Sequence, residues 1–288
     1  MKLKNFTLDH EQKNPLKKYP TQIKSLFESE DETKNELKHS QEKLANFQEL
    51  LYAQNEWAVL IVLQGMDTAG KDSLIEHVMK SVNPQGCDVT SFKRPTHLEL
   101  NHDFLWRVHA HLPERRKIGV FNRSYYEDII VPLVHPEVLK SSQLPKQILN
   151  SKKLLSDRCH DIVNFEKYLA RQGIIVIKIF LHLSKNEQKN RLLRRLEIPE
   201  KNWKFDPNDM TERSFWSEYQ RAYNFCLQKT SHEKAPWYVI PADDKNTARL
   251  IASQLIVSRM KELNLAFPKT SAENQKQLKQ YEKILKRK

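Results

Sequence analysis

A seven-residue loop between two apolar segments constrains the fold of this chain more than any other feature of its sequence. Six apolar residues and Gln64 occupy positions 58–64, GMDTAGK follows at 65–71, and an amphipathic segment begins at Lys71. The loop matches the G-x-x-x-x-G-K pattern, in which backbone N–H groups and the positive N-terminus of the next helix surround phosphate groups. The chain has only five glycines, so two at this spacing are informative. The pattern predicts a strand, a phosphate-binding loop and a helix; an ordinary strand–helix turn is the alternative.

The rest of the chain continues this alternation of short apolar runs and amphipathic segments. Apolar runs predict strands at residues 58–64, 87–93, 118–122, 174–181 and 237–240. Helical periodicity predicts helices at 33–51, 71–82, 98–111, 125–131, 146–171, 185–196, 209–228 and 247–263, with a loop at 197–206. Strands that are apolar throughout and alternate with helices favour an α/β fold with a five-stranded parallel sheet covered on both faces.

Changes of composition along the chain suggest its division into parts. Residues 1–55 are charged and lysine-rich and are expected to form an N-terminal helical extension. We expect the core at 56–263, with a lid at about 185–225, and a basic tail at 264–288 that is either frayed or a solvated helix.

Charge and composition limit the partners. The formal net charge is +12, and residues 264–288 hold seven basic and two acidic residues, so more than half of the excess lies in the body. A basic body favours a polyanionic partner: nucleic acid, an anionic membrane surface or a phosphate-rich substrate. The apolar run at 58–63 has six residues, or seven with Trp57, whereas a spanning helix needs about 20. Residues 1–15 are polar and contain no apolar stretch, so a secretory signal is not expected. The three cysteines are dispersed, which favours reduced thiols in the cytoplasm; they are Cys87, Cys159 and Cys226.

Several side chains of the phosphate loop are candidates for chemistry. Lys71 can place its ammonium against phosphate oxygens. Asp67 would repel phosphate unless a metal ion intervened, so it is a candidate Mg²⁺ ligand. Asp72 stands where the motif has Ser or Thr, and Ser73 follows one residue later. The remaining loop positions are expected to surround phosphate: Gly65, Met66, Thr68, Ala69 and Gly70.

A second cluster, FNRSYYED at 121–128, ends the third predicted strand. Ligands of open α/β sheets bind at the carboxyl ends of strands. Asn122 occupies the place of the usual metal-binding Asp, and the fork-shaped guanidinium of Arg123 suits phosphate oxygens. Glu127 is a candidate metal ligand. For Glu127 and Asp128 the alternative is a favourable interaction with a helix N-terminus.

Basic residues elsewhere could contact a polyanion. Lys93 and Arg94 are placed at the end of the second strand, and Arg107 in the next helix. Arg191 and Arg195 lie four residues apart on one helix, before a loop that contains Lys204, which suits a lid over phosphates. The run at 115–117 could extend such a basic track. A solvated basic surface is the alternative in each case.

Together these motifs resemble the polyphosphate kinase 2 family. The resemblance covers residues 8–257 and rests on GMDTAGK, VNPQGCDV, SFKRP, FLWR, LPERRKIGVFNRSYYED, PEKNWKF and APWYVIPADDK. It implies a thymidylate-kinase-like phosphate-loop fold of three layers with a helical lid, Mg²⁺-dependent phosphoryl transfer between inorganic polyphosphate and nucleotides, and a homo-oligomer. The residues that match the family's functional positions are Asp67, Lys71, Arg123, Arg191 and Arg195. Where much of the family has Asp, this chain has Asn122.

FNRSYYED with Glu127 looks like the class III branch, which implies reversible phosphorylation of both AMP and ADP, giving ADP and ATP. The acceptor phosphate is largely ionised at pH 7, so positioning and charge neutralisation are expected to suffice without a strong base. One alternative is an ATP-dependent nucleoside monophosphate kinase on the same fold. The other is a non-enzymatic nucleic-acid binder, for which the sequence has no RNA-binding, zinc or helix-turn-helix signature. We therefore expect neither nucleic acid nor membrane as a partner.

Overall fold

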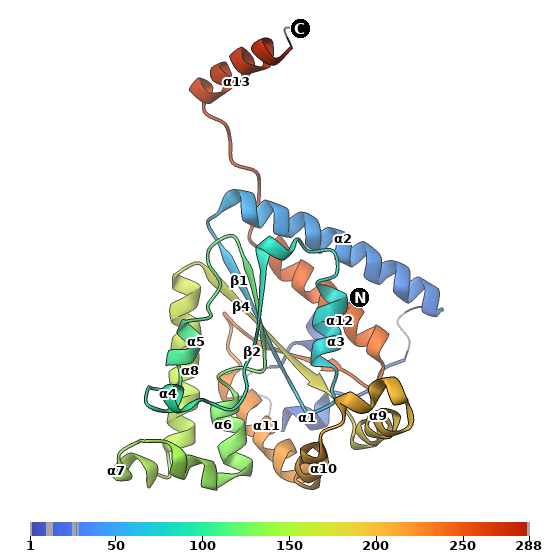
Figure 1. Ribbon diagram of the computed structural model, residues 1–288, viewed down its shortest axis with the longest axis vertical. Helices are drawn as coiled ribbons and strands as arrows, with labels where there is room; N and C mark the ends of the chain where they lie inside the picture. Colours follow the sequence, from blue (N-terminus) through green and yellow to red (C-terminus); the bar gives the residue numbers. More distant parts are fainter. Residues whose placement is uncertain (1, 10–13, 25–26, 28, 287–288) are drawn as a thin grey trace.

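Five parallel strands form the centre of the molecule (Figure 1). Their order in the sheet is β2-β3-β1-β4-β5. The structure is a computed structural model that describes residues 2–9, 14–24, 27 and 29–286. Its strands are β1 (Ala58–Gly65), β2 (Cys87–Ser91), β3 (Ile118–Asn122), β4 (Ile174–His182) and β5 (Trp237–Pro241). The expected α/β fold with a five-stranded parallel sheet is confirmed.

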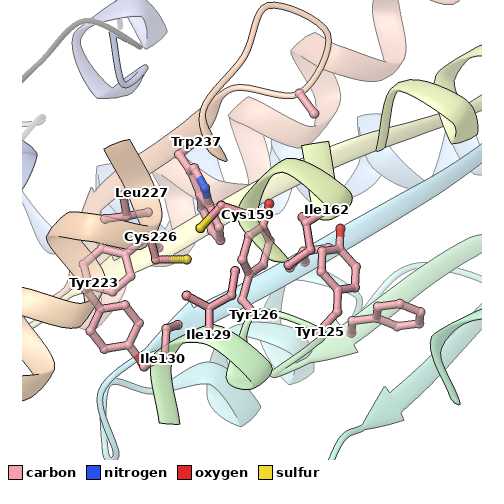
Figure 2. Close-up of a cluster of buried hydrophobic side chains, with 14 of the residues drawn as sticks. Tyr125, Tyr126, Ile129, Ile130, Cys159, Ile162, Tyr223, Cys226, Leu227 and Trp237 are labelled. Atoms are coloured by element: carbon pink, nitrogen blue, oxygen red, sulfur yellow. The ribbon is translucent and has the colours of Figure 1, made fainter. Parts of the chain in front are cut away.

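Helices cover both faces of this sheet. On one face lie α2 (Glu30–Gln54), α3 (Lys71–Val78) and α12 (Lys245–Lys261), and on the other α6 (Glu127–Val134), α8 (Leu154–Arg171) and α11 (Trp216–Thr230). Two hydrophobic clusters result, one on each side of the sheet. Figure 2 shows part of the cluster on the second face, where side chains of α6, α8, α11 and β5 meet. Burial from both sides explains why β1, β3 and β5 have no polar face, whereas the edge strand β2 is largely exposed and carries polar side chains.

Shorter elements connect these layers. Around α9 (Lys185–Glu197) the chain forms η4 (Pro199–Lys204) and α10 (Pro207–Ser214), and this group lies beside the carboxyl ends of the strands (Figure 1). The remaining short elements are η1 (Leu3–Phe6), α1 (Pro15–Lys18), η2 (Pro84–Gly86), α4 (His97–Leu100), α5 (Trp106–His109), η3 (Pro136–Ser141) and α7 (Lys146–Leu149). No helix in the described part of the chain combines the length and the apolar character needed to cross a membrane.

Three expected helices are each divided in two, and side chains that favour turns mark two of the three breaks. Segment 98–111 becomes α4 and α5, where the Asp103 carboxylate accepts from the Leu105 N–H (2.9 Å). Segment 146–171 becomes α7 and α8, where Ser151 Oγ accepts from the Lys153 N–H (3.2 Å). Segment 209–228 divides at Phe215 between α10 and α11. At the first two breaks, a short polar side chain accepts from a backbone N–H and so competes with the helical hydrogen bonds.

Helix α6 continues three residues beyond its expected end and contains Pro132. A proline inside a helix leaves the carbonyl four residues earlier without its N–H partner. That carbonyl belongs to Asp128, and Arg158 Nη1 of α8 donates to it at 2.7 Å. An arginine from a neighbouring helix therefore replaces the missing backbone donor, which allows the helix to reach Val134.

The register of the sheet places the basic run 115–117 far from the phosphate loop. Lys117 precedes the first residue of β3, and β3 runs parallel to β1 with Ile118 beside Val59. The run therefore lies at the amino end of the strands, where Lys117 pairs with Asp88 (3.2 Å) and Arg116 lies over the Tyr52 ring. The expectation that this run extends a track at the phosphate loop is wrong, because strand direction separates the two.

The two ends of the chain behave differently. The described part of the N-terminal segment packs on the body, since the Leu8 N–H donates to Trp237 O (2.7 Å) and Tyr19 is buried. At the other end α13 (Ala272–Leu285) stands apart from the body, and all its side chains are exposed (Figure 1). The tail therefore contains a solvated helix, one of the two expected forms.

Candidate active site

The loop between β1 and α3 has the backbone that the glycines were expected to allow. Gly65 and Gly70 have φ of 155° and 101°, which side-chain-bearing residues rarely adopt. A Cβ at Gly65 would lie 3.0 Å from Leu181 O, so that position also lacks space for a side chain. Thr68 has a left-handed φ of 65°, which is uncommon outside glycine and typical of functional loops. The loop therefore has a constrained, inward-turning backbone.

Lys71 lies inside this loop. Its Nζ donates to Gly65 O (2.8 Å) and to Met66 O (3.2 Å), and the side chain is buried. Burial lowers the pKa of Lys71, and the Arg123 guanidinium lowers it further, while Asp67 acts in the opposite direction. The ammonium is thus held by two carbonyls at the mouth of the loop, where it can turn to phosphate oxygens.

The outer side of the loop is bound by α9. Arg191 is 6% exposed and uses all five of its N–H groups on protein acceptors. Nη1 donates to the carbonyls of Thr68 and Ala69, and Nη2 to those of Ala242 and Asp243. Its Nε donates to the Glu187 carboxylate. In this arrangement all its donors serve to shape the loop, and its expected role in neutralising a transferring phosphoryl group stays a prediction.

A neighbouring residue of α9, Gln188, strengthens this connection. Its Nε2 donates to Asp67 O at 3.1 Å, and its Oε1 accepts from Arg213 Nη1 at 2.6 Å. Neither Gln188 nor Arg213 belongs to a recognisable motif, so the sequence gives no signal for them. Together with Arg191 they couple the geometry of the phosphate loop to α9 and α10.

Arg123 joins the two acidic residues that were expected to bind metal. Its Nη2 lies 2.6 Å from Asp67 Oδ1, and its Nη1 lies 3.9 Å from Glu127 Oε2. The backbone of Arg123 is left-handed (φ 62°), a strained conformation that turns the chain back at the end of β3. In the amide orientation that satisfies both of its ends, Gln64 Nε2 donates to Glu127 Oε1 at 3.1 Å. The sequence prediction that loop and strand end form one site is therefore supported by geometry.

The two positions that depart from the usual phosphate-loop pattern contact each other. Asn122 Nδ2 donates to Asp72 Oδ1 at 2.6 Å. One residue later, Ser73 Oγ accepts from Arg249 Nη2 of α12, also at 2.6 Å. Asn122 and Asp72 thus form a neutral–anionic pair at the start of α3, and the Ser73 hydroxyl is oriented by an arginine.

Arg107 lies deeper than the expected basic edge. It is buried, and its Nη1 donates to Lys93 O (2.9 Å) while Nη2 lies 3.5 Å from Asp128 Oδ2. Burial raises the pKa of Asp128 from 3.8 to about 6, although Arg107 and Arg158 oppose this shift. Lys93 and Arg94 themselves are exposed and follow β2, which ends at Ser91, two residues earlier than expected.

The remaining lid residues contact each other more than they contact the loop. Arg195 Nη1 bonds to Asp209 Oδ2 (2.6 Å) and Lys204 O (3.0 Å), which joins α9 to η4 and α10. Lys204 Nζ lies 4.9 Å from the centre of the Trp203 ring, and Trp203 is 78% exposed. Trp203 and Lys204 therefore lie at the surface, whereas Asp209 is close enough to the site for Asp67 to add to the rise of its pKa that burial causes.

Another group of basic side chains lies beside the loop and was missed by the sequence analysis. Lys245, at the start of α12, has its pKa lowered by burial and by four nearby cations. These cations come from α9, η4 and α12 and are Arg191, Arg194, Arg249 and Lys201. Arg249 is anchored to Ser73, two residues after Lys71. Only the three-dimensional arrangement reveals this group, because its members are dispersed over residues 191–249.

A sequence profile described as polyphosphate kinase 2 matches residues 27–268. The chain belongs to the polyphosphate kinase 2 family. It is 46% identical over 280 residues to the ADP-polyphosphate phosphotransferase of Rhodopseudomonas palustris, with 97% of each chain covered. It is 38% identical to the AMP/ADP-polyphosphate phosphotransferase of Meiothermus ruber, with 95% of this chain and 98% of that one covered.

A solved structure of a family member has the same fold. The crystal structure of polyphosphate kinase 2 from Arthrobacter aurescens superposes with a TM-score of 0.79 at 34% identity, covering 94% of this chain and 98% of that one. The chain is thus a polyphosphate kinase, a nucleotide-binding transferase, as the motifs indicated. Family membership also disfavours the two alternatives, an ATP-dependent monophosphate kinase and a nucleic-acid binder.

Proposed function

We propose that this polyphosphate kinase transfers a phosphoryl group from inorganic polyphosphate to ADP and to AMP, giving ATP and ADP, and that the reaction is reversible. The observation that carries the proposal is the meeting of Asp67, Arg123 and Glu127 beside Lys71. A lysine and an arginine can neutralise phosphate oxygens, while two carboxylates can hold a cation between phosphates. The names of the two relatives support ADP as an acceptor in both and AMP in one.

Mg²⁺ fits the acidic pair. No group of three or more His, Cys, Asp or Glu side chains suited to a metal occurs among the described residues. Mg²⁺ is commonly bound by one or two carboxylates together with substrate phosphates, so Asp67 and Glu127 suffice. Both face the same guanidinium, Arg123. When bound there, Mg²⁺ would neutralise charge on the phosphate oxygens.

The chain's own groups supply positioning and electrostatic stabilisation. Lys71 and the loop N–H groups cradle the phosphates, and Arg123 neutralises the transferring group at the end of β3. Arg191 and Gln188 hold the loop in shape from α9. Arg195 holds the lid segments together through Asp209, and closure of the lid excludes water that would hydrolyse the donor.

Polyphosphate is a linear polyanion, so its binding groove should be a basic track. We assign this track to Lys245 and Arg249 with Arg194 of α9 and Lys201 of η4, because Arg249 adjoins the start of α3 and the other three lie near it. Lys93, Arg94 and Lys204 lie at the outer edges of the same end of the sheet and can lengthen it. The expected homo-oligomer and the class III assignment remain predictions.

The decisive experiment is a coupled assay for nucleotide products with purified protein, Mg²⁺ and polyphosphate. ADP alone and AMP alone are supplied as acceptors, and ATP replaces polyphosphate in a third reaction. Product from both acceptors with polyphosphate supports the proposal. Product from ADP only would restrict the acceptor, as in the name of the Rhodopseudomonas relative, and transfer from ATP but not from polyphosphate would contradict it.

A further inference from the structure

A polar network that is buried except for the partly exposed His232 lies behind the turn that presents Arg123 and Glu127. The turn continues from Arg123 through Tyr125 and Tyr126, whose side chains point into the core (Figure 2). Both hydroxyls donate to the same oxygen, Oε1 of Glu166 in α8, at 2.9 and 2.6 Å. Glu166 is far from the phosphate loop in sequence and belongs to no motif, so the sequence alone does not indicate a role for it.

The second oxygen of Glu166 is equally well satisfied. Oε2 accepts from Lys178 Nζ of β4 at 2.7 Å and lies 2.9 Å from His232 Nε2. Lys178 also donates to Tyr126 OH (3.1 Å) and to Thr230 O (2.7 Å). The side chains of Glu166 and Lys178 have no exposed area at all. One carboxylate therefore connects the turn to α8, β4 and the segment before β5.

Such a network is costly unless its charged groups are satisfied, because desolvation of a buried charge is large. Both oxygens of Glu166 have partners, whereas Nδ1 of His232 has none. Burial alone raises the pKa of Glu166, but Lys178 and the hydrogen-bond donors outweigh it, and the pKa lies below its ordinary value. The carboxylate thus remains charged and accepts both tyrosine hydroxyls. Apolar residues could fill this space without such a cost, so the network calls for an explanation beyond packing.

The turn itself supplies that explanation. Arg123 has a left-handed backbone that persists only where the surroundings fix it. Its N–H is bound to Leu63 O (3.1 Å) on one side, and the two tyrosines fix the chain two and three residues later. Arg123 and Glu127 flank the tyrosines and point to the opposite side, toward Asp67.

We propose that Glu166, charged and held by Lys178, is a positioning residue that fixes the turn carrying Arg123 and Glu127. It touches neither substrate nor the reacting atoms and acts through Tyr125 and Tyr126. This inference rests on the function proposed above for Arg123 and Glu127. Its effect should appear in the rate of the bound complex more than in the binding of polyphosphate, because the basic track lies elsewhere.

The test removes the two hydroxyls with the paired substitutions Tyr125→Phe and Tyr126→Phe, which keep the rings in the core. We expect kcat to fall about tenfold, because small misplacements of catalytic groups slow the reaction. The KM for polyphosphate should stay within about twofold of the parent value. Hydrogen exchange of the amides in 123–127 should accelerate, while exchange in 65–71 stays unchanged. If the double variant does not fold, Tyr125→Phe alone is measured in the same way.

The matched control is Leu51→Ala, a fully buried position of α2 on the other face of the sheet. It should lower thermal stability without changing kcat at a temperature where the protein is folded. An equal loss of kcat in this control, or unchanged exchange at 123–127 in the tyrosine variant, would overturn the proposal. The exchange measurement needs no turnover, so it remains informative even if polyphosphate proves not to be the donor.

A second background tests the route of the effect. In a chain that already carries Arg123→Lys and Glu127→Gln, the two tyrosine substitutions should reduce kcat by less than about threefold, because both groups that they orient have been changed. A full tenfold further loss would show that the network acts on another part of the site, and would contradict the assignment to this turn.

Discussion

The amide of Asn122 donates to the carboxylate of Asp72 at 2.6 Å. In most phosphate-loop enzymes these two positions hold an Asp and a Ser or Thr, which share the Mg²⁺ ion. Here the acid and the neutral residue have exchanged places, and they bind each other. The cation site is therefore expected at Asp67 and Glu127, on the other side of Arg123.

A substitution of Asn122 tests the contact between Asn122 and Asp72. Asn122→Asp would place a second carboxylate against Asp72, and like charges disfavour ionisation of both. Because Asp72 is exposed, solvent screening limits the effect, and we expect a loss of about 1 kcal/mol in the free energy of unfolding at pH 7. Denaturant unfolding measures it. The double variant Asp72→Ser/Asn122→Asp should regain the loss; equal stability of Asn122→Asp and the parent would show that the contact is unimportant.

Loss of Lys71 should abolish most of the transfer while leaving the fold intact. Lys71→Ala removes the only lysine of the loop, and loss of one such electrostatic contact costs about 10²–10³ in rate. The initial rate with polyphosphate and ADP is compared with that of Lys80→Ala, an exposed lysine beyond the end of α3. Wild-type turnover in a folded Lys71→Ala protein would remove this residue from the mechanism.

Glu127 should distinguish the two acceptors. AMP is one phosphoryl unit shorter than ADP, so its acceptor phosphate needs an additional cation contact to approach the donor, and Glu127 can supply a hard oxygen ligand. Glu127→Asn should therefore lower the rate with AMP by at least about tenfold more than the rate with ADP. Initial rates are measured at saturating polyphosphate.

The control for this comparison is Glu114→Asn, an exposed acid before β3 at the opposite end of the sheet. It should leave both rates unchanged. Equal losses for AMP and ADP in Glu127→Asn would indicate a general metal or structural role, and no loss for either would leave only the favourable interaction with the start of α6.

The basic track should be detectable through salt dependence. Lys245→Gln should raise KM for polyphosphate about three- to tenfold with little change of kcat, and should flatten its dependence on salt, because fewer counterions are displaced. Arg115→Gln is the matched control, since Arg115 is exposed at the amino end of the strands. A chain that ends at Leu263 should also behave as the parent. If either control weakens polyphosphate binding more than Lys245→Gln does, the track is elsewhere.

Asp128 should give the stability a recognisable pH dependence. Its folded pKa of about 6 exceeds the ordinary 3.8, so the folded state holds this proton more tightly than the unfolded chain does. The stability that it contributes is complete below pH 3.8 and is lost as the pH rises through about 6. Each pKa unit corresponds to about 1.4 kcal/mol, and solvent access to 19% of the side chain reduces the total to about 2 kcal/mol.

The measurement is the free energy of unfolding of the parent and of Asp128→Asn at pH 4 and pH 7. Between pH 4 and pH 7 the free energy of unfolding of Asp128→Asn should rise by about 2 kcal/mol relative to that of the parent, because only the parent loses stability as Asp128 ionises. A difference that does not depend on pH would mean that Asp128 titrates normally.

The positions of the strands and of the phosphate loop were accessible from sequence because each depends on local patterns. The apolar runs, the two glycines and Lys71 are contiguous, and strand direction then brings Arg123 beside Asp67. The contacts of Arg191 were not accessible from sequence. An arginine on a helix has the same sequence pattern whether its guanidinium binds a phosphate ligand or, as here, four carbonyls from two distant loops.

Interruptions and continuations of helices depend on similar long-range contacts. Pro132 predicts the end of α6, and only the position of Arg158 on another helix explains why the helix continues. In the same way, Lys245 and Arg249 follow an unremarkable strand, and their importance arises from their distance to Ser73 and α9. Residues whose partners are far away in sequence leave no periodic signal.

Helix α12 begins beside the phosphate loop and ends at the amino end of the strands, so α13 extends from the side of the molecule that faces away from the site. The C-terminus is therefore the natural point of attachment to a solid support. A protein immobilised there would turn its catalytic end toward the solution. Long polyphosphate chains could then reach it without passing the carrier surface, which attachment through lysines near the lid would not allow.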